Sequence, residues 1–380
     1  MKICAIICEY NPFHNGHQYQ LREAKRLSGA DAILCIMSGN FVQRGEAAIM
    51  DKYTRAKHAV QAGADIVIEL PTVFATSNAE LFARGAIHIL SSIPAVSTLC
   101  FGCENADKEA FLTSAKQLSN EPKEVSLKIK ENMAHGMSYA KARALAWENR
   151  IPSSLLSSPN NILGLEYTKA LLAANSHIKI LPIARIGAGY HEALLQENYP
   201  SATAIRAAIE NNTKIEKQLP DFVKNDLPKT LNKTIETLEK YALISRSNKE
   251  IAKICDCSEG LENALKKAAK SNVSFVEGLT SSRYTASRIR RIALQNLLQI
   301  DECFIRNCLA TSLYLRVLAT KKERTDVLSV LSEGTSPLIL RAHDEDCLDE
   351  IGKACYEKDM FAEDIYGLLY PITKEKLIFI

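Results

Sequence analysis

Residues 2–17 read KICAIICEYNPFHNGH, an apolar run that leads into a polar loop with two histidines. The run from Lys2 to Cys8 has the length and the unbroken apolar character of a buried parallel strand. Apolar residues at helical spacing follow directly, from Asn15 to Leu27. A buried strand joined by a short loop to an amphipathic helix is the opening unit of a parallel α/β sheet.

The same alternation continues along the first half of the chain. The runs expected as strands are Asp31–Met37, Asp65–Leu70, Thr98–Phe101 and Ile178–Ile183, and the segments expected as helices are Asp51–Ala62, Asn78–Leu90 with Asn78 as its cap, and one that starts near Ser201. Right-handed crossovers would join these elements. The pattern therefore predicts an α/β fold with a Rossmann-like, doubly wound parallel sheet.

Length and residue usage predict two domains. A chain of 380 residues is too long for one ordinary core. Residues 107–150 are polar and helical in pattern, so we expect them as an insertion. After about residue 212 the strand signal fades, and Lys, Glu, Leu and Ala recur at helical spacing. We expect an α/β domain over residues 1–212 and an all-helical domain over residues 213–380.

Composition is that of a globular protein, with 47% apolar and 24% charged residues and a net charge of only +3. No stretch approaches the ~20 apolar residues that span a bilayer, and the N-terminal run is too short for a secretory signal. The eleven cysteines are scattered, often within apolar runs, as is usual in a reducing compartment. We therefore expect a cytoplasmic protein.

Two close cysteine pairs, Cys100 with Cys103 and Cys255 with Cys257, raise the question of zinc. No matching Cys or His pair follows at the spacing of a structural zinc site. We interpret these cysteines as core thiols and expect no metal ligands from the protein.

The loop after the first strand is the strongest candidate site. Ligands of open α/β sheets bind beyond the carboxyl ends of the strands, and a helix N-terminus attracts phosphate. His14 and His17 would project from the first helical turn as hydrogen-bond donors to a polyphosphate, and Gly16 would let a nucleotide approach the backbone. Neither a Walker loop nor G-x-G-x-x-G follows this strand. A pair of histidines that only cap the helix is the structural alternative.

Two further segments are suited to phosphate. Ser201 and Thr203 at a helix start, with Arg206 one turn later, would form a second phosphate clamp. The segment from Ser282 to Arg291 carries four arginines and a tyrosine without an acid, which indicates either nucleic-acid contact or a solvated helix face.

These motifs resemble those of a known superfamily. N-P-F-H-N-G-H after the first strand, together with SATAIR at residues 201–206, is similar to the signature of the nucleotidyltransferase α/β-phosphodiesterases, whose ATP site resembles that of class I aminoacyl-tRNA synthetases. Most of the chain further resembles the family of bacterial tRNA(Met) cytidine acetate ligases. The similar segments are Ser38–Glu46, Gly63–Pro71, Ser158–Tyr167, Pro182–Arg185, Gly189–Glu192 and Arg283–Arg291.

The resemblance implies an enzyme that activates acetate with ATP and Mg²⁺ as acetyl-adenylate and then acetylates N4 of the wobble cytidine of elongator tRNA(Met). Residues 1–212 would be its nucleotidyltransferase-like catalytic domain and residues 213–380 its tRNA-binding domain. The implied partners are tRNA and acetate, and neither a membrane nor DNA is expected.

The resemblance also implies the site residues. The catalytic residues would be His14, His17 and Arg206. The tRNA-binding residues would be Arg283, Arg288, Arg290 and Arg291. The ATP-binding residues would be Ile7, Cys8, Glu9, Tyr10, Asn11, Pro12, Phe13, His14, Asn15, Gly16, His17, Gln18, Tyr19, Gln20, Gly102, Asn160, Arg185, Ser201 and Thr203.

Two questions stay open at this stage. Acylation of a weak aromatic amine benefits from a base, and Glu46, Asp51 and Glu69 are candidates that fit surface or capping carboxylates equally well. Two other functions also use these motifs. One is a small-molecule adenylyl- or cytidylyltransferase, which rarely needs a large helical domain with an arginine run. The other is a non-catalytic ATP- or RNA-binding protein.

Overall fold

The computed structural model describes residues 1–186, 200–215, 217–229, 235–258, 260–373 and 376–380, and in these ranges eight strands form one sheet. Along the sheet the order is β10-β8-β5-β2-β1-β6-β7, with β9 beside β8. All pairings in this sheet are parallel except that of β5 with β8. The strands are β1 (Ile3–Cys8), β2 (Ala32–Ser38), β5 (Ile66–Leu70), β6 (Val96–Cys103), β7 (Lys179–Ala184), β8 (Leu315–Thr320), β9 (Leu338–Ile339) and β10 (Ile378–Phe379).

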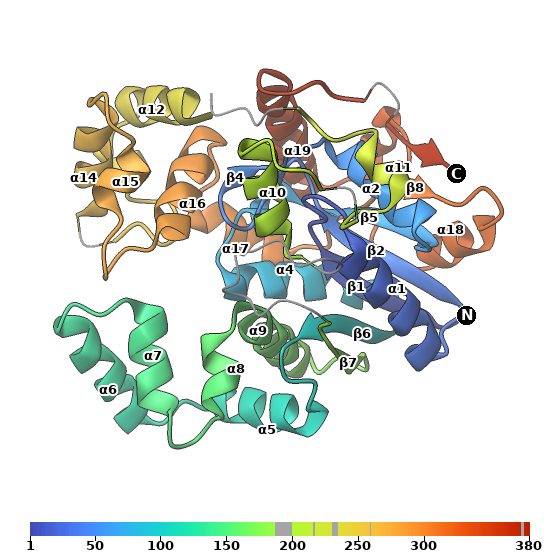
Figure 1. Cartoon of the computed structure of the whole chain (residues 1–380), viewed down its shortest axis with the longest axis horizontal. Coiled ribbons are helices and arrows are strands. Elements are labelled where there is room, and N and C mark those ends of the chain that lie inside the picture. Colours follow the sequence, from blue (N-terminus) through green and yellow to red (C-terminus); the bar gives the residue numbers. More distant parts are fainter. Residues whose placement is uncertain (187–199, 216, 230–234, 259, 374–375) are drawn as a thin grey trace.

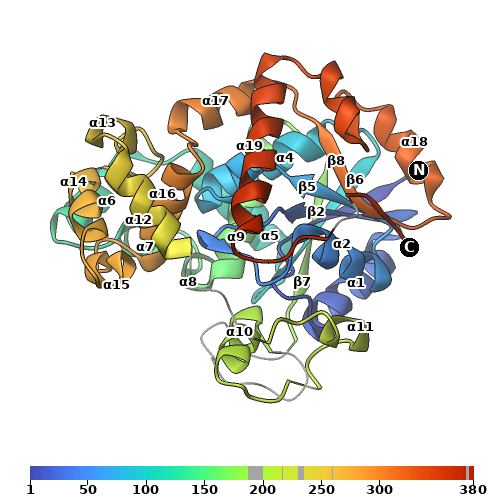
Figure 2. The same ribbon diagram turned by 90° about the horizontal axis from the view of Figure 1, so that it is seen from above.

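The chain winds outward from β1 in both directions, first to β2 and β5 and then back to β6 and β7. The switch point between β1 and β6 is where open α/β sheets bind ligands, and the loop with the two histidines leaves β1 there. Helices cover both faces of the sheet (Figure 2). One face is covered by α1 (Asn15–Ser28), α2 (Lys52–Gln61), α10 (Ala202–Glu210) and α11 (Asp221–Lys224), and the other by α3 (Thr72–Ala75), α4 (Ala79–Ser91), α5 (Lys108–Ser119), α9 (Pro159–Ala173) and α19 (Glu350–Gly367).

The structure confirms the predicted α/β class, and the expected strands and helices differ from the observed ones by at most about two residues at most ends. The expected cap is present, because Asn78 Oδ1 accepts a hydrogen bond from the Leu81 N–H (3.0 Å). Ser201, expected near a helix start, also caps its helix, and its Oγ accepts a hydrogen bond from the Ala204 N–H (3.1 Å). The expected insertion contains α5, α6 (Lys123–Ala134) and α7 (Tyr139–Trp147), followed by α8 (Ser153–Ser157). Of these helices, α5 packs against α9 and so belongs to the cover of the sheet.

A helical unit with its own core lies beside the sheet, above α6 and α7 in the view of Figure 1. Leu243, Ile251, Leu265, Phe275 and Ile289 are among its fully or almost fully buried residues. It comprises α12 (Ile235–Ser245), α13 (Asn248–Ile251), α14 (Leu261–Ala269), α15 (Phe275–Leu279) and the first part of α16 (Ala286–Leu297). Along the described ranges, no helix combines the length and the apolar character needed to cross a membrane.

The expectation that residues 213–380 are helical throughout is wrong for the last part of the chain. After α17 (Glu302–Ala310), β8 joins the sheet antiparallel to β5, and β10 extends it; α18 (Thr325–Ser332) lies between these strands in sequence. Arg316 interrupts the apolar pattern of β8, yet it is only 5% exposed. Its guanidinium contacts Glu69 (3.2 Å) and Glu363 (3.5 Å), which come from distant parts of the sequence, so the strand signal depends on partners that a local pattern does not show.

Candidate functional site

Two stacked imidazoles stand at the start of α1. His14 is the N-cap, and its Nδ1 accepts a hydrogen bond from the Gly16 N–H at 3.1 Å. The Nδ1 of His17 accepts one from the His14 N–H at 3.3 Å, and the ring centroids lie 3.6 Å apart. Because both Nδ1 atoms accept, each neutral ring carries its proton on Nε2 and has one N–H left to donate. The same rings therefore cap the helix and offer two donors.

Burial keeps both imidazoles uncharged. Burial, followed by the positive charge of Arg185, lowers the pKa of His14 to about 3. Burial, then His14 and Arg185, lower the pKa of His17 well below its usual value. At neutral pH the pair consists of neutral donors whose protonation is insensitive to small changes in pH.

The glycine of the motif serves the histidine beside it. A Cβ at position 16 would lie 2.9 Å from Cε1 of His14, closer than real Cβ contacts, so a side chain there would push the ring away. Beneath the pair, Tyr10 packs against both Phe13 and His17, each at 4.8 Å between centroids. Gly16 thus leaves room for the His14 ring, and its expected role toward a nucleotide stays a prediction.

A pocket opens beyond the carboxyl ends of β1 and β6 and contains most of the expected ATP-binding residues. An adjoining hollow that is also lined by His14 and His17 adds Gly16 and Tyr19. The expected residues that line the pocket itself are Ile7, Cys8, Glu9, Tyr10, Asn11, His14, His17, Gln20, Gly102, Asn160, Arg185, Ser201, Thr203 and Arg206.

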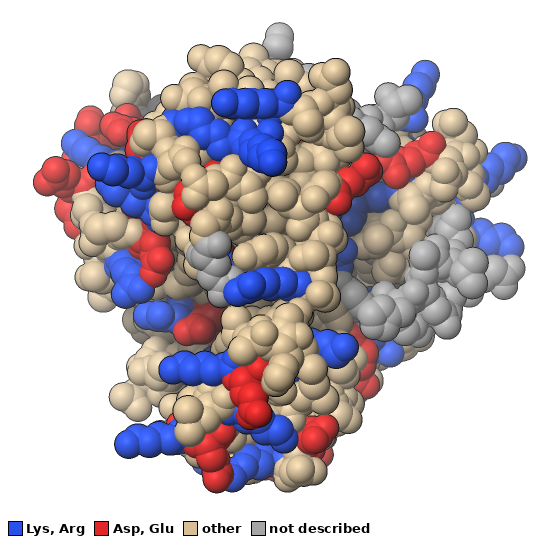
Figure 3. Space-filling view, turned by 90° about the vertical axis from the view of Figure 1, so that its left-hand side faces the viewer, with Lys and Arg blue, Asp and Glu red and all other residues tan. Residues whose placement is uncertain are grey.

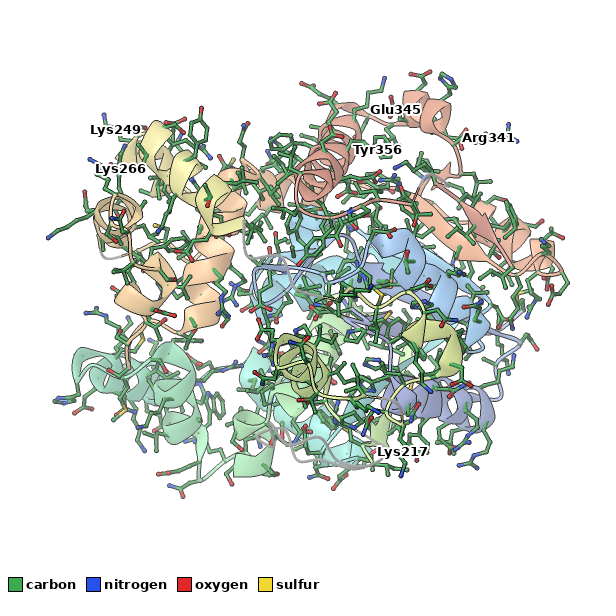
Figure 4. The ribbon with its side chains drawn as sticks, turned by 45° about the horizontal axis from the view of Figure 1, so that its top comes forward. Lys217, Lys249, Lys266, Arg341, Glu345 and Tyr356 are labelled. Atoms are coloured by element: carbon green, nitrogen blue, oxygen red, sulfur yellow. The ribbon has the colours of Figure 1, made fainter. Side chains whose placement is uncertain are left out.

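Four of the expected ATP-binding residues line neither hollow. Pro12 and Phe13 are buried beneath the loop, and Gln18 is exposed. Asn15 donates from Nδ2 to the backbone oxygen of Lys217 at 2.8 Å, and Figure 4 shows Lys217 at the edge of the molecule near α1. For these four residues the structure gives a packing or surface position instead of a place in the pocket.

Two arginines from separate elements face the pocket beside the histidines. Arg206 of α10 donates from Nη1 to the Asn11 backbone oxygen (2.8 Å) and from Nη2 to Thr203 Oγ1 (3.4 Å), which ties α10 to the loop after β1. Arg185 follows β7, and its Cγ would lie 3.5 Å from a Cβ at Gly102, so the glycine leaves room for the arginine. Two cations and two N–H donors in one pocket suit a polyanion such as a nucleotide triphosphate.

Motif reasoning missed two parts of the pocket wall. One is the hairpin of β3 (Phe41–Val42) and β4 (Glu46–Ala47), of which only Glu46 was named, as a candidate base; similarity over Ser38–Glu46 was the available signal for the rest. The other is apolar, and its residues come from three separate elements, of which similarity over Ser158–Tyr167 covered only α9. The pocket residues outside the predicted ATP-binding and catalytic residues are Val42, Gln43, Arg44, Glu46, Phe82, Phe101, Pro159, Leu163, Tyr167 and Ala202.

The three candidate bases occupy different positions. Asp51 caps α2 by accepting from the Tyr53 N–H (2.9 Å), and Glu69 is bound to Lys52 Nζ (2.7 Å). Neither lines the pocket, whereas Glu46 does. The structure therefore leaves Glu46 as the one of the three that could meet a substrate.

The basic run, with Arg283 before α16 and three arginines on it, does not present four equivalent arginines. Arg290 contacts Glu46 at the pocket (2.7 Å), and Arg291 contacts Asp256 (3.4 Å) with its side chain only 13% exposed. Arg288 donates from Nε to the Asp256 backbone oxygen (3.0 Å). Arg283 is exposed, with its guanidinium 5.8 Å from the centre of the Tyr284 ring.

A groove between the insertion and the helical unit collects several cations. It is lined by Arg283, Arg288 and Arg291 from the helical unit and by Tyr139 and Arg143 from α7. Figure 3 looks onto the face that carries both parts, where Lys and Arg side chains are interleaved with Asp and Glu. This face is mixed in charge and not uniformly basic.

The cysteine pairs that raised the question of zinc form no metal site in the described ranges. All eleven cysteines are free thiols, and no group of three His, Cys, Asp or Glu residues in those ranges could hold a metal ion. Cys100 and Cys103 are buried on β6. The segment Gly189–Glu192 lies outside the described residues.

Comparison with known proteins gives one consistent result. The HIGH Nucleotidyl Transferase family matches residues 1–377. A tRNA(Met) cytidine acetate ligase from Caldanaerobacter subterraneus subsp. tengcongensis is 38% identical over 97% of this chain and 96% of its own length. A protein with the same name from Clostridium botulinum is 39% identical over 88% of each chain.

Solved structures of Thermotoga maritima TmcAL are similar over their whole length. The apo form superimposes with a TM-score of 0.90 at 28% identity, and both chains are covered completely. The form bound with alpha-thio ATP gives a TM-score of 0.86 at the same identity and coverage. A protein of this fold therefore binds an ATP analogue.

Proposed function

The chain belongs to the HIGH nucleotidyl transferase family and, within it, to the tRNA(Met) cytidine acetate ligases, and we propose that it acetylates N4 of the wobble cytidine of elongator tRNA(Met). It is an ATP-dependent ligase. The observation that carries the proposal is the grouping of the neutral His14–His17 pair with Arg185 and Arg206 in one pocket at the switch point of the sheet. The histidine-type phosphate site agrees with the name of the family.

In the first half-reaction, ATP lies across the start of α1 with its phosphates on the two Nε2–H donors. A carboxylate oxygen of acetate attacks the α-phosphorus, and pyrophosphate leaves. The carboxylate is already a nucleophile, so the protein contributes position and charge and supplies no attacking group. Arg185 and Arg206 would stabilise the charge that builds on the phosphate oxygens.

In the second half-reaction, the N4 amine of the cytidine attacks the carbonyl carbon of acetyl-adenylate, and AMP leaves. Apolar side chains on the opposite wall, Phe82, Phe101 and Leu163, are suited to hold a nucleoside by packing against its ring. Mg²⁺ bound to the phosphates would offset their charge; with Glu9 and Glu46 as the only carboxylates among the described lining residues, the nucleotide would hold most of its ligands.

The RNA would contact the helical unit through α16 and the groove beside α7. An anticodon loop suits this site because its bases can be turned outward toward a pocket. Reduced cysteines and a tRNA substrate both support a cytoplasmic location.

The decisive test is acetate-dependent exchange of pyrophosphate into ATP, measured on the wild type and on His17→Asn. The Asn Oδ1 can replace Nδ1 as the acceptor of the His14 N–H, so the cap is kept while the Nε2–H donor is lost. We expect exchange to fall by about 10²–10³-fold with an unchanged unfolding midpoint.

The matched control is His177→Ala, an exposed histidine before β7 at the opposite end of the strand from the pocket. Exchange by His17→Asn within about threefold of the wild type would mean that the pair only caps the helix. Exchange with nicotinamide mononucleotide or a pantetheine phosphate instead of acetate would favour a small-molecule adenylyltransferase, and no turnover with acetate and tRNA present would favour a binding protein.

A further inference from the structure

The β3–β4 hairpin lies between the ATP pocket and the helical unit, and Figure 1 shows β4 between α16 and α10. Its turn is tight, with the Gly45 N–H donating to the Val42 oxygen at 2.9 Å. Gly45 has a left-handed φ of +74°, and a Cβ there would lie 2.5 Å from the backbone nitrogen of Arg291. The tip of the hairpin is therefore packed directly on the backbone of α16.

Glu46 is held in this hairpin by arginines from two other elements. Its Oε1 accepts a hydrogen bond from Arg290 Nη1 of α16 at 2.7 Å. Its Oε2 lies 3.9 Å from Arg206 Nη2 of α10, which is beyond hydrogen-bond distance. The side chain is 30% exposed and lines the pocket. One oxygen is thus held by an arginine of the helical unit, while the other is placed to accept a hydrogen bond.

Other carboxylates near the site are already committed. Asp51 and Glu69 lie in a helix cap and a buried ion pair. Glu9, the other carboxylate among the described residues that line the pocket, accepts the Gln43 N–H at 2.8 Å. It follows directly after β1 at the base of the loop, whereas Glu46 lies on the side of the pocket nearest to the helical unit.

We infer that Glu46 is the catalytic carboxylate of acetyl transfer, an inference that rests on the proposed function. Carboxylates are natural hydrogen-bond acceptors for the exocyclic N4 amine of cytosine. Glu46 Oε2 accepts one N4–H and so directs the nitrogen at the acetyl carbon. As the N–C bond forms, the C–O bond to AMP breaks, AMP leaves as an anion, and the N4 proton passes to Glu46 and then to solvent.

A carboxylate is a sufficient base for this step. Cytosine N4 has almost no basicity before attack, but it becomes positively charged and strongly acidic as it bonds to the carbonyl carbon. The proton therefore moves to a group of ordinary basicity at that moment. Arg290 is a positioning residue, since it holds Glu46 from the helical unit that we propose to bind RNA.

The experiment separates the two half-reactions in the full-length protein. Acetyl-adenylate is first formed from ATP and labelled acetate, elongator tRNA(Met) is then added, and a single turnover of acetyl transfer is followed. For Glu46→Gln, which keeps the size of the side chain, we expect transfer to slow by about 10²-fold or more. Acetate-dependent exchange and tRNA affinity should change by less than about fivefold, because a general base acts only in the transfer step.

Two further variants make the test specific. Glu46→Asp restores the carboxylate and should recover at least about tenfold of the lost transfer rate. Glu104→Gln is the matched control, because Glu104 accepts from Asn160 at the pocket (2.7 Å) and should affect exchange and transfer equally.

Three results would overturn the inference: transfer by Glu46→Gln within about fivefold of the wild type, exchange that falls in parallel with transfer, or no recovery by Glu46→Asp. Parallel loss would mean that Glu46 acts only through Arg206. Failure of the proposed function is distinguishable, since the wild type itself would then show no acetate-dependent exchange or no acetylated cytidine, and the inference would fall with it.

Discussion

Glu69 and Glu46 each bridge two cations, and they differ in their access to water. Glu69 of β5 contacts Lys52 Nζ (2.7 Å) and Arg316 Nη1 (3.2 Å), and the three side chains are at most 6% exposed. Glu363 of α19 completes this closed network through the same two cations. It joins α2, β5, β8 and α19, which are distant in the sequence.

Glu46 makes a similar bridge between Arg290 and Arg206, but its side chain is 30% exposed and lines a pocket. The two bridges have the same chemistry, and solvent access determines the role of each. A buried charge that loses its partner remains unsolvated, whereas a charge at a pocket edge is solvated by water or by a substrate. The closed bridge holds the fold, and the open bridge is free to serve a reaction.

The largest effect on stability is expected from breaking the closed bridge. Glu69→Ala leaves Lys52 and Arg316 facing one another with only Glu363 between them, so we expect the free energy of unfolding to fall by about 3–5 kcal/mol. Urea unfolding followed by circular dichroism measures the loss. Glu46→Ala is the control, with an expected loss of about 1 kcal/mol or less. Equal losses for the two variants would contradict the distinction between the bridges.

The sequence predicted the parts of the fold that depend on local pattern. Apolar runs located β1, β2, β5 and β7, and Asn78 and Ser201 marked two helix starts through their own side chains. The strand β8 was missed because Arg316 interrupts it. Burial of that arginine depends on Glu69 and Glu363, and no local pattern records such partners.

The candidate site shows the same division. His14, His17 and Arg206 were found because each belongs to a short motif at a helix start. The apolar wall was not found, since Phe82, Phe101 and Leu163 are ordinary core residues until α4, β6 and α9 meet. Motifs thus predicted the charged side of the pocket, and tertiary packing formed the other side.

A smaller effect is expected from acid, which weakens the closed bridge reversibly. Burial alone would raise the pKa of Glu363, but Lys52, Lys376 and Arg316 outweigh it and lower that pKa to about 2. Above the ordinary value of 4.5 the carboxylate is charged in both states and its stabilisation is complete. As pH falls from that value toward 2, the unfolded chain binds the proton first, so stability is lost.

Glu363→Gln removes this contribution. The difference in unfolding free energy between wild type and variant should be largest near pH 7 and should shrink by at least about 1 kcal/mol by pH 3. Urea unfolding of both proteins at pH 7, 5, 4 and 3 measures the trend. A difference that stays constant with pH would show that the charge of Glu363 does not contribute through this network.

The smallest effect is expected in the basic run near the open bridge, where the arginines have different partners. Arg290 and Arg291 are bound to Glu46 and Asp256, but Arg283 is exposed on the groove beside α7. Arg283→Ala should therefore weaken binding of elongator tRNA(Met) by about 3–10-fold and reduce the slope of log affinity against log salt by about one. Filter binding at 50, 100 and 200 mM salt measures both quantities.

Arg291→Ala is the contrasting variant within the same basic run, on α16. Its side chain is 13% exposed and paired, so its loss should lower the unfolding midpoint while the salt slope stays within error of the wild type. Equal salt slopes for wild type and Arg283→Ala would remove Arg283 from the RNA surface. A reduced slope for Arg291→Ala would mean that RNA competes with Asp256 for a paired arginine. The paired arginines of the basic run would then also count as contacts to the substrate.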